Sequence, residues 1–367
     1  MSDKSSRTPR VAVVGLGKMG ISHLSMANGS PHMQVTATCD TAPLVASMIE
    51  RYCGIPEVKG YDKLLTRDDV DAVIIATPTR AHEPMIRAAF DAGKHVFCEK
   101  PLTLSADASE ALAAEATAKS LVAQVGYHNR FVGTFAEAKR LIAAGTLGRI
   151  RHVHAEAYGP VVLRPQGKTW RSAPEEGGGC LYDYAAHPIN LMNWYVGGAL
   201  ACPGADLPSQ YSVGVDDAVY ANLQFAEGVS GQVSVNWSDE ATRKMTTKIT
   251  VYGDGGKLAV DRQELSVFVG ATGTPNDDYG AGWTVRNITE LTPPIDFYLR
   301  GEEYSAQLDS FADAIRDGRP PERNDFASAA QTDRTLAMIR AATQGETGRI
   351  VVEAPPRSLF QRIFARA

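Results

Sequence analysis

The chain has 367 residues, of which 44% are apolar and 22% are charged, a length and composition typical of a soluble protein with two domains. The formal net charge is −5 and acidic and basic residues are interspersed, so nucleic acid is not an expected partner. The five scattered cysteines form no Cys-x-x-Cys pair, which predicts reduced thiols in a cytoplasmic protein and neither a disulfide framework nor a zinc site. No apolar run is long enough to span a bilayer, and the polar N-terminal stretch lacks a signal-peptide core.

The first third of the chain alternates strand patterns with helix patterns. Apolar runs predict buried parallel strands at residues 10–15, 34–40, 71–78 and 95–101. Helical spacing is present at residues 81–93 and 105–119, and a further strand is expected at residues 121–130. Because such alternating elements are joined by crossover connections, the pattern predicts a doubly wound parallel sheet.

The rest of the chain has a different pattern. Residues 149–159 alternate apolar and polar side chains, and residues 216–238 and 248–261 each predict two antiparallel strands joined at a turn with glycine. Helical patterns return near residues 303–317 and 324–342. The predicted fold class is therefore α/β, with a second α/β domain built on a large, open, mainly antiparallel sheet. The expected limits are residues 1–128 for the first domain, 129–353 for the second and 354–367 for a C-terminal tail.

A glycine-rich turn follows the first predicted strand. Gly15, Gly17 and Gly20 have the G-x-G-x-x-G spacing, in which the first glycine permits a tight turn, the second lets a pyrophosphate approach the backbone, and the third lets helix and strand pack closely. Asp40 ends the second strand, where an acid accepts hydrogen bonds from an adenosine ribose and repels a 2′-phosphate. These features predict a Rossmann domain that binds NAD, with NADP less favoured. The alternative is an inherited fold with an empty nucleotide site.

Two other strand ends carry polar residues. Thr77 and Pro78 lie where the carboxyl ends of strands line the ligand crevice, although Thr-Pro also commonly caps a helix. Glu99 and Lys100 follow the strand at 95–98 directly. There Lys100 is expected to place an ammonium beside a reacting oxygen, and Glu99 to bind the ribose or carboxamide of the cofactor. The alternative is a surface ion pair.

The segment GGGCLYDYAAHPIN, residues 177–190, is the second unusual stretch. Its three glycines are expected to be flexible, and a helix is expected to begin after them. Asp183 and His187 are spaced i, i+4 and share a helix face. A position near a helix N-terminus favours a neutral imidazole, which suits a proton acceptor. The alternative is an N-terminal helix charge and a packed histidine.

These segments resemble the glucose–fructose oxidoreductase/inositol dehydrogenase (Gfo/Idh/MocA) family. The matching stretches are GLGKMG (15–20), the run from ATPTRAH to KPLTLS (76–105), VGYHNRF (125–131) and GGGCLYDYAAHPINLMNW (177–194), in the order of the family. Two residues depart from the common pattern. Ala185 stands where glycine is common and Asn190 where aspartate is common, which puts the detailed shape of the substrate pocket in doubt.

The resemblance implies NAD or NADP as cofactor, a sugar, cyclitol or related polyol as substrate, and a homodimer or homotetramer formed through the open sheet. It implies that Lys100 is the active-site lysine, Asp183 the substrate-side acid and His187 the proton-transfer histidine. Other residues in matching positions are implied to bind the cofactor, namely Lys18, Met19, His82, Trp170 and Arg171. Tyr127 is implied to contact the substrate.

The implied reaction is hydride transfer between nicotinamide and a hydroxyl-bearing carbon of a sugar, nucleotide sugar or cyclitol. His187 takes the hydroxyl proton, Lys100 stabilises the developing negative charge on oxygen, and no metal is needed. One alternative is a glycosidase that uses tightly held NAD for transient oxidation. Another is a non-catalytic nucleotide-dependent regulator, against which the intact Lys100, Asp183 and His187 argue.

A loop at residues 164–172 is expected to lie over the crevice. It offers Arg164, Lys168 and Arg171 with Trp170 between them, which favours an anionic or nucleotide-activated sugar over a neutral polyol. The alternative is that Trp170 and Arg171 only close over the nicotinamide and pyrophosphate. The tail segment RSLFQRIFARA, residues 357–367, is a short basic amphipathic pattern. It is expected to pack on its own protein or subunit, or else on a membrane surface or partner.

Overall fold

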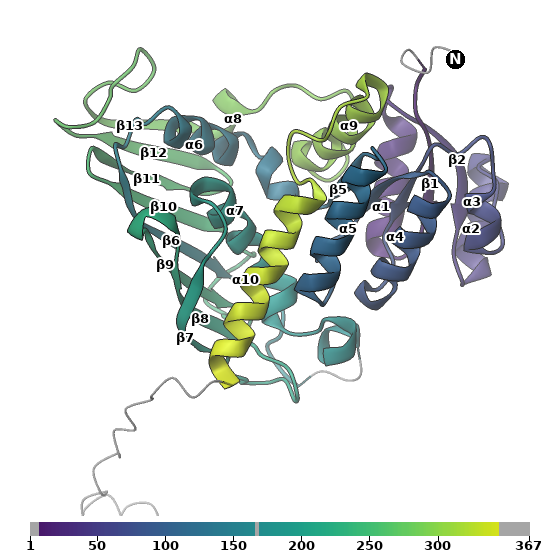
Figure 1. Cartoon of the computed structure of the whole chain (residues 1–367), viewed down its shortest axis with the longest axis horizontal. Helices are drawn as coiled ribbons and strands as arrows, with labels where there is room; N and C mark the ends of the chain where they lie inside the picture. Colours follow the sequence, from purple (N-terminus) through teal and green to yellow (C-terminus); the bar gives the residue numbers. More distant parts are fainter. Residues whose placement is uncertain (1–6, 166–168, 345–367) are drawn as a thin grey trace, which may run out of the picture.

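The computed structural model describes residues 7–165 and 169–344, which build two β-sheets with helices between and around them (Figure 1). The first sheet has five parallel strands in the order β2-β1-β3-β4-β5, as predicted. Its strands are β1 (Arg10–Val14), β2 (Gln34–Cys39), β3 (Ala72–Ile75), β4 (His95–Cys98) and β5 (Ala123–Val125).

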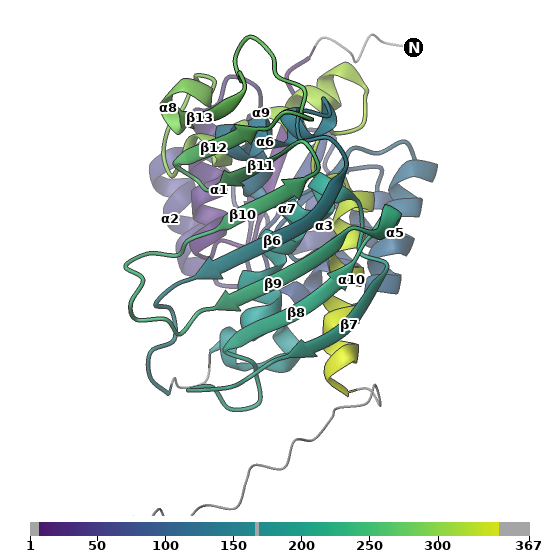
Figure 2. The same ribbon diagram turned by 90° about the vertical axis from the view of Figure 1, so that its left-hand side faces the viewer.

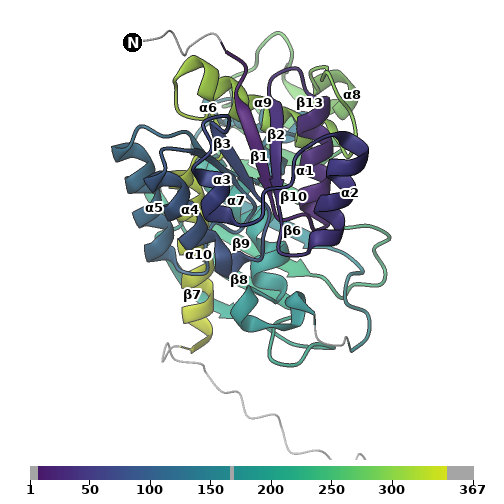
Figure 3. The ribbon, with the colours of Figure 1, turned by 90° about the vertical axis from the view of Figure 1, so that its right-hand side faces the viewer.

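Helices cover both faces of this parallel sheet (Figure 3). They are α1 (Lys18–Gly29), α2 (Pro43–Cys53), α3 (Tyr61–Leu65), α4 (His82–Asp91), α5 (Ala106–Ala118) and, from much later in the chain, α9 (Glu302–Asp317). Successive strand residues point to opposite faces. Val11 and Val13 therefore join the core that α1 and α9 cover, whereas Ala12 and Val14 join the core that α4 and α5 cover.

The second sheet has eight strands in the order β13-β12-β11-β10-β6-β9-β8-β7. Only β6 and β9 pair in parallel, and the other neighbours are antiparallel, which confirms the predicted mainly antiparallel sheet. The strands are β6 (Ile150–Tyr158), β7 (Ala201–Asp206), β8 (Ala218–Gln224), β9 (Ser230–Asn236), β10 (Lys248–Gly253), β11 (Gly256–Val260), β12 (Glu264–Val269) and β13 (Gly282–Asn287).

One face of the second sheet is covered and the other is open. The helices α6 (Gly133–Ala143), α7 (Ala186–Val196) and α10 (Phe326–Gln344) lie on the covered face. Figure 2 looks onto the other face, which no helix among the described residues covers. The side chains alternate accordingly. In β8, Ala221 and Leu223 are buried, whereas Tyr220 and Asn222 are exposed.

The chain returns to the parallel sheet after the second sheet is complete. Beyond α8 (Ile288–Leu291), α9 packs against α1, and α10 packs along α5 (Figure 1). The N–H of Val125 donates to the carbonyl of Asn324 at 2.8 Å, which ties β5 to the segment before α10. The C-terminal helices therefore hold the two halves together, and the limits at residues 128 and 353 stay a prediction. The predicted tail lies outside the described residues.

Two local predictions can be compared with the observed elements. The helices expected at 303–317 and 324–342 are α9 and α10, with ends shifted by at most two residues. The strand expected at 121–130 is shorter, because β5 ends at Val125 and the chain then forms the 3₁₀ helix η2 (His128–Phe131). Among the described residues, no helix is both long enough and apolar enough to cross a membrane.

Candidate active site

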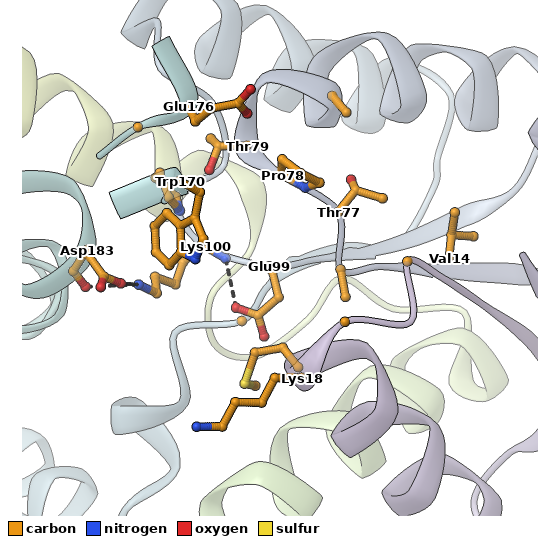
Figure 4. A pocket seen from close by; sticks show the side chains of 18 of the residues that line it. Val14, Lys18, Thr77, Pro78, Thr79, Glu99, Lys100, Trp170, Glu176 and Asp183 are labelled. Carbon is orange, nitrogen blue, oxygen red and sulfur yellow. Dashed lines mark hydrogen bonds and ion pairs between the residues drawn. The ribbon is translucent and has the colours of Figure 1, made fainter. Parts of the chain in front are cut away.

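A cavity of about 1680 Å³ lies at the carboxyl ends of β1, β3 and β4, between the parallel sheet and segments from the second half of the chain (Figure 4). In a doubly wound sheet the ligand crevice lies at these strand ends, at the point where the strand order reverses. Here that point lies between β1 and β3. The predicted site residues in the cavity wall are Gly15, Gly17, Lys18, Met19, Asp40, Thr77, Pro78, Glu99, Lys100, Trp170, Arg171, Asp183 and His187.

The glycine turn has a different geometry at each of its three glycines. Gly15 has φ +87°, and a Cβ there would lie 2.8 Å from the carbonyl oxygen of Ala76. A Cβ on Gly20 would lie 1.7 Å from the carbonyl oxygen of Gly15, so only glycine lets α1 pack so closely. A Cβ on Gly17 would meet nothing within 4 Å. Gly17 therefore faces open space at the start of α1, where a pyrophosphate can approach the backbone.

Asp40 stands directly after β2, at the edge of the same cavity. Its carboxylate accepts hydrogen bonds from the backbone N–H groups of Leu16 and Ala42, the second at 2.6 Å. These bonds fix the carboxylate beside the glycine turn. Glu57 and Lys59 also line this end of the cavity. No motif near Asp40 predicted either residue.

Thr77 and Pro78 line the cavity and also precede the 3₁₀ helix η1 (Thr79–Ala81), although the Thr77 hydroxyl does not cap it. His82 lies behind this wall, with its ring nitrogens 3.0 Å from the carbonyl oxygens of Thr77 and Pro101. Burial lowers the pKa of His82 and outweighs the contacts with these carbonyl oxygens, which by themselves would raise it. His82 therefore braces two strand-end loops from behind and does not line the cavity.

Glu99 and Lys100 do not form the surface ion pair that was the alternative for this segment. The Glu99 carboxylate accepts a hydrogen bond from His23 Nε2 at 2.6 Å and from the Lys100 backbone N–H at 3.2 Å. The ammonium of Lys100 points away and donates to Asp183, at 2.8 Å to Oδ1 and 2.9 Å to the carbonyl oxygen (Figure 4). Burial opposes the ionisation of Glu99, but the His23 hydrogen bond and the nearby Lys100 charge outweigh it and lower the pKa of Glu99.

Asp183 is bound by two cations. Besides Lys100, Nε of Arg171 donates to its Oδ2 at 3.0 Å, and the Arg171 guanidinium lies 4.5 Å from the ring centre of Trp170. Burial favours the protonated form of Asp183, but the charges of Lys100 and Arg171 prevail and lower its pKa to about 2. Asp183 is therefore an anion whose two oxygens are already engaged.

His187 is a buried, neutral imidazole. Burial and the charge of Lys100 lower its pKa to about 3, although Asp183 acts in the opposite sense. Its Nδ1 is buried and has no hydrogen-bond partner among residues 7–165 and 169–344. The rings of His128 and Tyr127 pack against it edge to face, with centroids 5.0 and 6.1 Å away. A neutral imidazole in a cavity wall is able to accept a proton from a bound hydroxyl.

The glycine run before Asp183 is closely packed, so the expectation of flexibility is wrong. Gly177 and Gly179 have φ of +80° and +104°, and a Cβ on Gly178 would lie 2.5 Å from the Arg171 carbonyl oxygen. A Cβ on Gly179 would lie 2.8 Å from Oδ1 of Asp216. The glycines are needed because backbone and side chains approach closely at each of them.

Asp216 anchors the helix start that carries the two catalytic candidates. Its carbonyl oxygen accepts the Cys180 N–H at 2.8 Å, and its carboxylate accepts the Leu181 N–H at 2.6 Å. The first turn is the π-helical segment η5 (Leu181–Ala185), which leads directly into α7. Asp183 therefore lies in a π-helical turn. This turn is wider than the α-helical turn that the i, i+4 spacing of Asp183 and His187 predicts.

Comparison with known proteins agrees with this architecture. Residues 9–127 match an oxidoreductase family with an NAD-binding Rossmann fold (GFO_IDH_MocA), and residues 135–259 match the GFO/IDH/MocA C-terminal domain. The chain belongs to the Gfo/Idh/MocA family. It is thus an NAD-binding oxidoreductase of a family that includes sugar and cyclitol dehydrogenases.

The relatives cover nearly the whole chain. The scyllo-inositol 2-dehydrogenase (NAD(+)) of Bacillus subtilis is 27% identical over 92% of this chain and 94% of its own length. The inositol 2-dehydrogenase of Rhizobium meliloti is 28% identical over 92% of this chain and 98% of its own length. A solved structure of levoglucosan dehydrogenase with NADH and levoglucosan has a TM-score of 0.81 and 25% identity, and covers 92% of this chain and 97% of that chain.

The two departures from the Gfo/Idh/MocA pattern lie outside the cavity wall. Ala185 is fully buried in η5. Asn190 is buried in α7, where its Oδ1 accepts a hydrogen bond from Nε of Arg130 at 2.8 Å and its amide donates to Thr332 at 3.1 Å. Arg130 thus contacts an amide, and burial lowers the pKa of Arg130 to about 10. Both departures act on packing behind the site.

Several residues proposed from the sequence do not line the cavity. Gly20 packs α1 on the glycine turn, and Tyr127 is buried behind His187 with no hydrogen-bond partner for its hydroxyl in the described part of the chain. Arg164 is exposed and is absent from the cavity wall. Lys168 lies outside the described residues.

The cavity wall also contains residues that sequence analysis did not assign. His128 lies in the segment VGYHNRF, so the family resemblance already pointed to its neighbourhood. Arg262 contacts Asn129 at 3.0 Å and forms an ion pair with Glu303. Tyr304 stacks on His128 with ring centroids 4.3 Å apart. No local motif marks these later residues. The turn between β11 and β12 brings Arg262 to the site, and the return of the chain in α9 brings Glu303 and Tyr304.

Proposed function

We propose that this protein is a dehydrogenase that transfers hydride between NAD and a hydroxyl-bearing carbon of a sugar or cyclitol. One observation carries the proposal. The hydrogen-bonded Lys100–Asp183 pair and the neutral His187 line the same cavity as the open glycine turn at Gly17. When bound, NAD supplies the hydride acceptor or donor. The protein residues handle the proton and the charge on oxygen.

His187 and Lys100 have separate roles at the reacting hydroxyl. In alcohol oxidation His187 accepts the hydroxyl proton, because its imidazole is neutral. The Lys100 ammonium, held by Asp183 at 2.8 Å, stabilises the negative charge that develops on that oxygen. Asp183 keeps Lys100 and Arg171 in place. The same groups serve ketone reduction in reverse.

NAD is the proposed cofactor in preference to NADP. The Asp40 carboxylate is held at the end of β2 by backbone N–H groups, where it accepts hydrogen bonds from a ribose and repels a 2′-phosphate. Lys59 in the same part of the wall is the residue that would oppose this preference. Calorimetric titration of both cofactors tests it, and equal or tighter binding of NADP contradicts it.

A neutral polyol is the better supported substrate class. The sequence-based preference for an anionic sugar rested on Arg164, Lys168 and Arg171. Arg171 is engaged with Asp183 and Trp170, and Arg164 is outside the cavity wall, so neither offers a free cation to a phosphate. The relatives named for inositol and levoglucosan point the same way.

We also propose that the open face of the second sheet forms an interface between copies of this chain. Tyr252, Lys257, Phe268 and Trp283 are paired across four neighbouring strands, β10 to β13, and so form one row on that face. Trp283 is 62% exposed. An exposed aromatic row on an uncovered sheet is a typical association surface.

The test of the dehydrogenase activity is a substrate screen by NADH absorbance. The panel contains scyllo-inositol, myo-inositol, levoglucosan, common free sugars and nucleotide sugars, with wild type, Lys100→Met and His187→Ala. Turnover of a neutral polyol by wild type, with large losses in both variants, is the expected result. Binding of NAD without turnover of any compound would contradict the proposal and favour a nucleotide-dependent regulator.

A further inference from the structure

Glu99 lies at the nicotinamide end of the cavity, an assignment that rests on the proposed function. The pyrophosphate of a dinucleotide fits at the glycine turn, at the switch point between β1 and β3. Asp40 marks the side of β2, where the adenosine belongs. The second nucleoside must therefore extend toward the ends of β3 and β4, and Glu99 follows β4 directly and faces the cavity there.

His23 holds the Glu99 carboxylate from the side of α1. Its Nε2 is 2.6 Å from Glu99 Oε1, and the His23 side chain is fully buried, whereas the Glu99 side chain keeps 13% exposure toward the cavity. Gly126 closes the other side, since a Cβ on it would lie 3.0 Å from the same carboxylate oxygen. The carboxylate is therefore fixed in position between α1 and the loop after β5.

The His23 ring is enclosed by the protein on the side away from Glu99. Its Nδ1 is buried with no hydrogen-bond partner in the described part of the chain, and its ring packs edge-on against Phe97 with centroids 5.3 Å apart. Nε2 is therefore the ring nitrogen that has a polar partner in the described part of the chain, and it holds the Glu99 carboxylate.

The ammonium of Lys100 is directed away from the Glu99 carboxylate. It forms an ion pair with Asp183 at 2.8 Å, an acid that it shares with Arg171, while the side-chain partner of Glu99 is His23. Of the two residues that follow β4, Glu99 is the one that presents a carboxylate to the cavity.

We propose that Glu99, held by His23, is a fixed negative charge that makes the protein bind oxidised nicotinamide in preference to reduced nicotinamide. The nicotinamide ring of NAD⁺ carries a formal positive charge, and that of NADH is neutral. The two cofactors are otherwise alike in charge and hydrogen-bonding groups. A carboxylate buried beside the ring attracts the first and not the second, and the low local dielectric strengthens the attraction.

The consequence is a shift in the midpoint potential of the bound NAD⁺/NADH couple. A tenfold preference for NAD⁺ lowers the midpoint potential of the bound two-electron couple by about 30 mV. Such a protein takes up the oxidised cofactor and releases NADH more readily, while hydride transfer to the bound NAD⁺ becomes less favourable by the same factor. His23 is a positioning residue in this arrangement, because it acts on the cofactor only through Glu99.

The experiment measures dissociation constants of NAD⁺ and NADH by fluorescence and calorimetric titration, without substrate. Glu99→Gln removes the charge and keeps the shape. His23→Leu removes the donor, and His23→Gln keeps an N–H that reaches the carboxylate. Asp40→Asn is the matched control, because it lies at the adenosine end, which is identical in NAD⁺ and NADH. Thermal unfolding of each variant verifies that it is folded.

The expected result is a loss of about tenfold in the preference for NAD⁺ over NADH in Glu99→Gln, and a similar loss in His23→Leu. His23→Gln should keep most of the preference, and the double variant Glu99→Gln/His23→Leu should lose no more than Glu99→Gln alone. Asp40→Asn should weaken both cofactors by the same factor. Equal weakening of both cofactors by Glu99→Gln overturns the charge proposal, and an unchanged ratio in His23→Leu overturns the role of His23. Failure of wild type to bind either cofactor would overturn the proposed function itself.

Discussion

At the scale of single residues, His187 and its neighbours determine the chemistry that the cavity supports. His187→Ala should slow hydride transfer by roughly 10² to 10⁴, because the hydroxyl proton loses its acceptor, while NAD binding should change little. Single-turnover absorbance and a separate NAD titration measure the two effects. Tyr127→Phe is the control, since the Tyr127 hydroxyl has no partner in the described chain and lies outside the cavity wall. It should retain turnover within about twofold of wild type. Turnover near the wild-type rate in His187→Ala would mean that the proton leaves by another route.

The lowered pKa of His187 also predicts a pH dependence of stability. A histidine in an unfolded chain titrates near pH 6.5, whereas burial and Lys100 lower the pKa of folded His187 to about 3. As the pH falls through this window, the unfolded state binds a proton before the folded state does. The stability that neutral His187 contributes is therefore present above pH 6.5 and is lost as the pH falls toward 3.

The measurement is urea unfolding of wild type and His187→Gln at a series of pH values. Between pH 6 and pH 4 the free energy of unfolding of wild type should fall more steeply, by up to about 1.4 kcal/mol per pH unit. The comparison isolates His187 because the other buried histidines are present in both proteins. Parallel curves would show that His187 titrates normally in the folded state.

At the scale of elements, the π-helical turn η5 depends on the glycine run before it. Gly179 has φ +104°, and a Cβ there would lie 2.8 Å from Oδ1 of Asp216, the residue that receives the N–H groups at the start of η5. Gly179→Ala should therefore cost about 2–3 kcal/mol of stability and most of the turnover, because it displaces the segment that carries Asp183.

Gly197→Ala is the matched control for this prediction. Gly197 ends α7 with φ +88°, but a Cβ there would meet nothing within 4 Å. Its substitution should cost only about 1 kcal/mol, from backbone strain, and should leave turnover near wild type. Denaturant unfolding and NAD-dependent turnover compare the two variants. If they lose turnover equally, the close contact with Asp216 is not what positions the site.

At the scale of the whole molecule, the uncovered sheet predicts association. Trp283→Glu places a charge in the aromatic row of the open face and should shift the protein toward monomer, with association weakened by about tenfold or more. Light scattering after size-exclusion chromatography at several concentrations measures this. Leu44→Glu, on the exposed side of α2 with 71% exposure, is the control and should not change the mass. An unchanged oligomer in Trp283→Glu would exclude this face as the interface.

Sequence alone determined the features that depend on backbone geometry and period. The glycine spacing at Gly15, Gly17 and Gly20 predicted the turn because each position has its own steric requirement, visible in one local motif. Apolar runs and alternation predicted a parallel sheet followed by a mainly antiparallel one, since buried and half-buried strands differ in pattern. The same local signals, supported by a family resemblance, selected Lys100, Asp183 and His187.

Only the tertiary structure decided which of these groups meet. Lys100 donates to Asp183, 83 positions away, and Glu99 pairs with His23, 76 positions away. Neither contact follows from spacing along the chain. The glycines at 177–179 were expected to be flexible, because their packing against Arg171 and Asp216 arises from other segments. Tyr304 reaches the cavity only because the chain returns to the parallel sheet in α9, and Arg262 only because the turn between β11 and β12 lies beside it. Contacts between distant segments depend on how whole elements pack, and a local sequence pattern does not determine that packing.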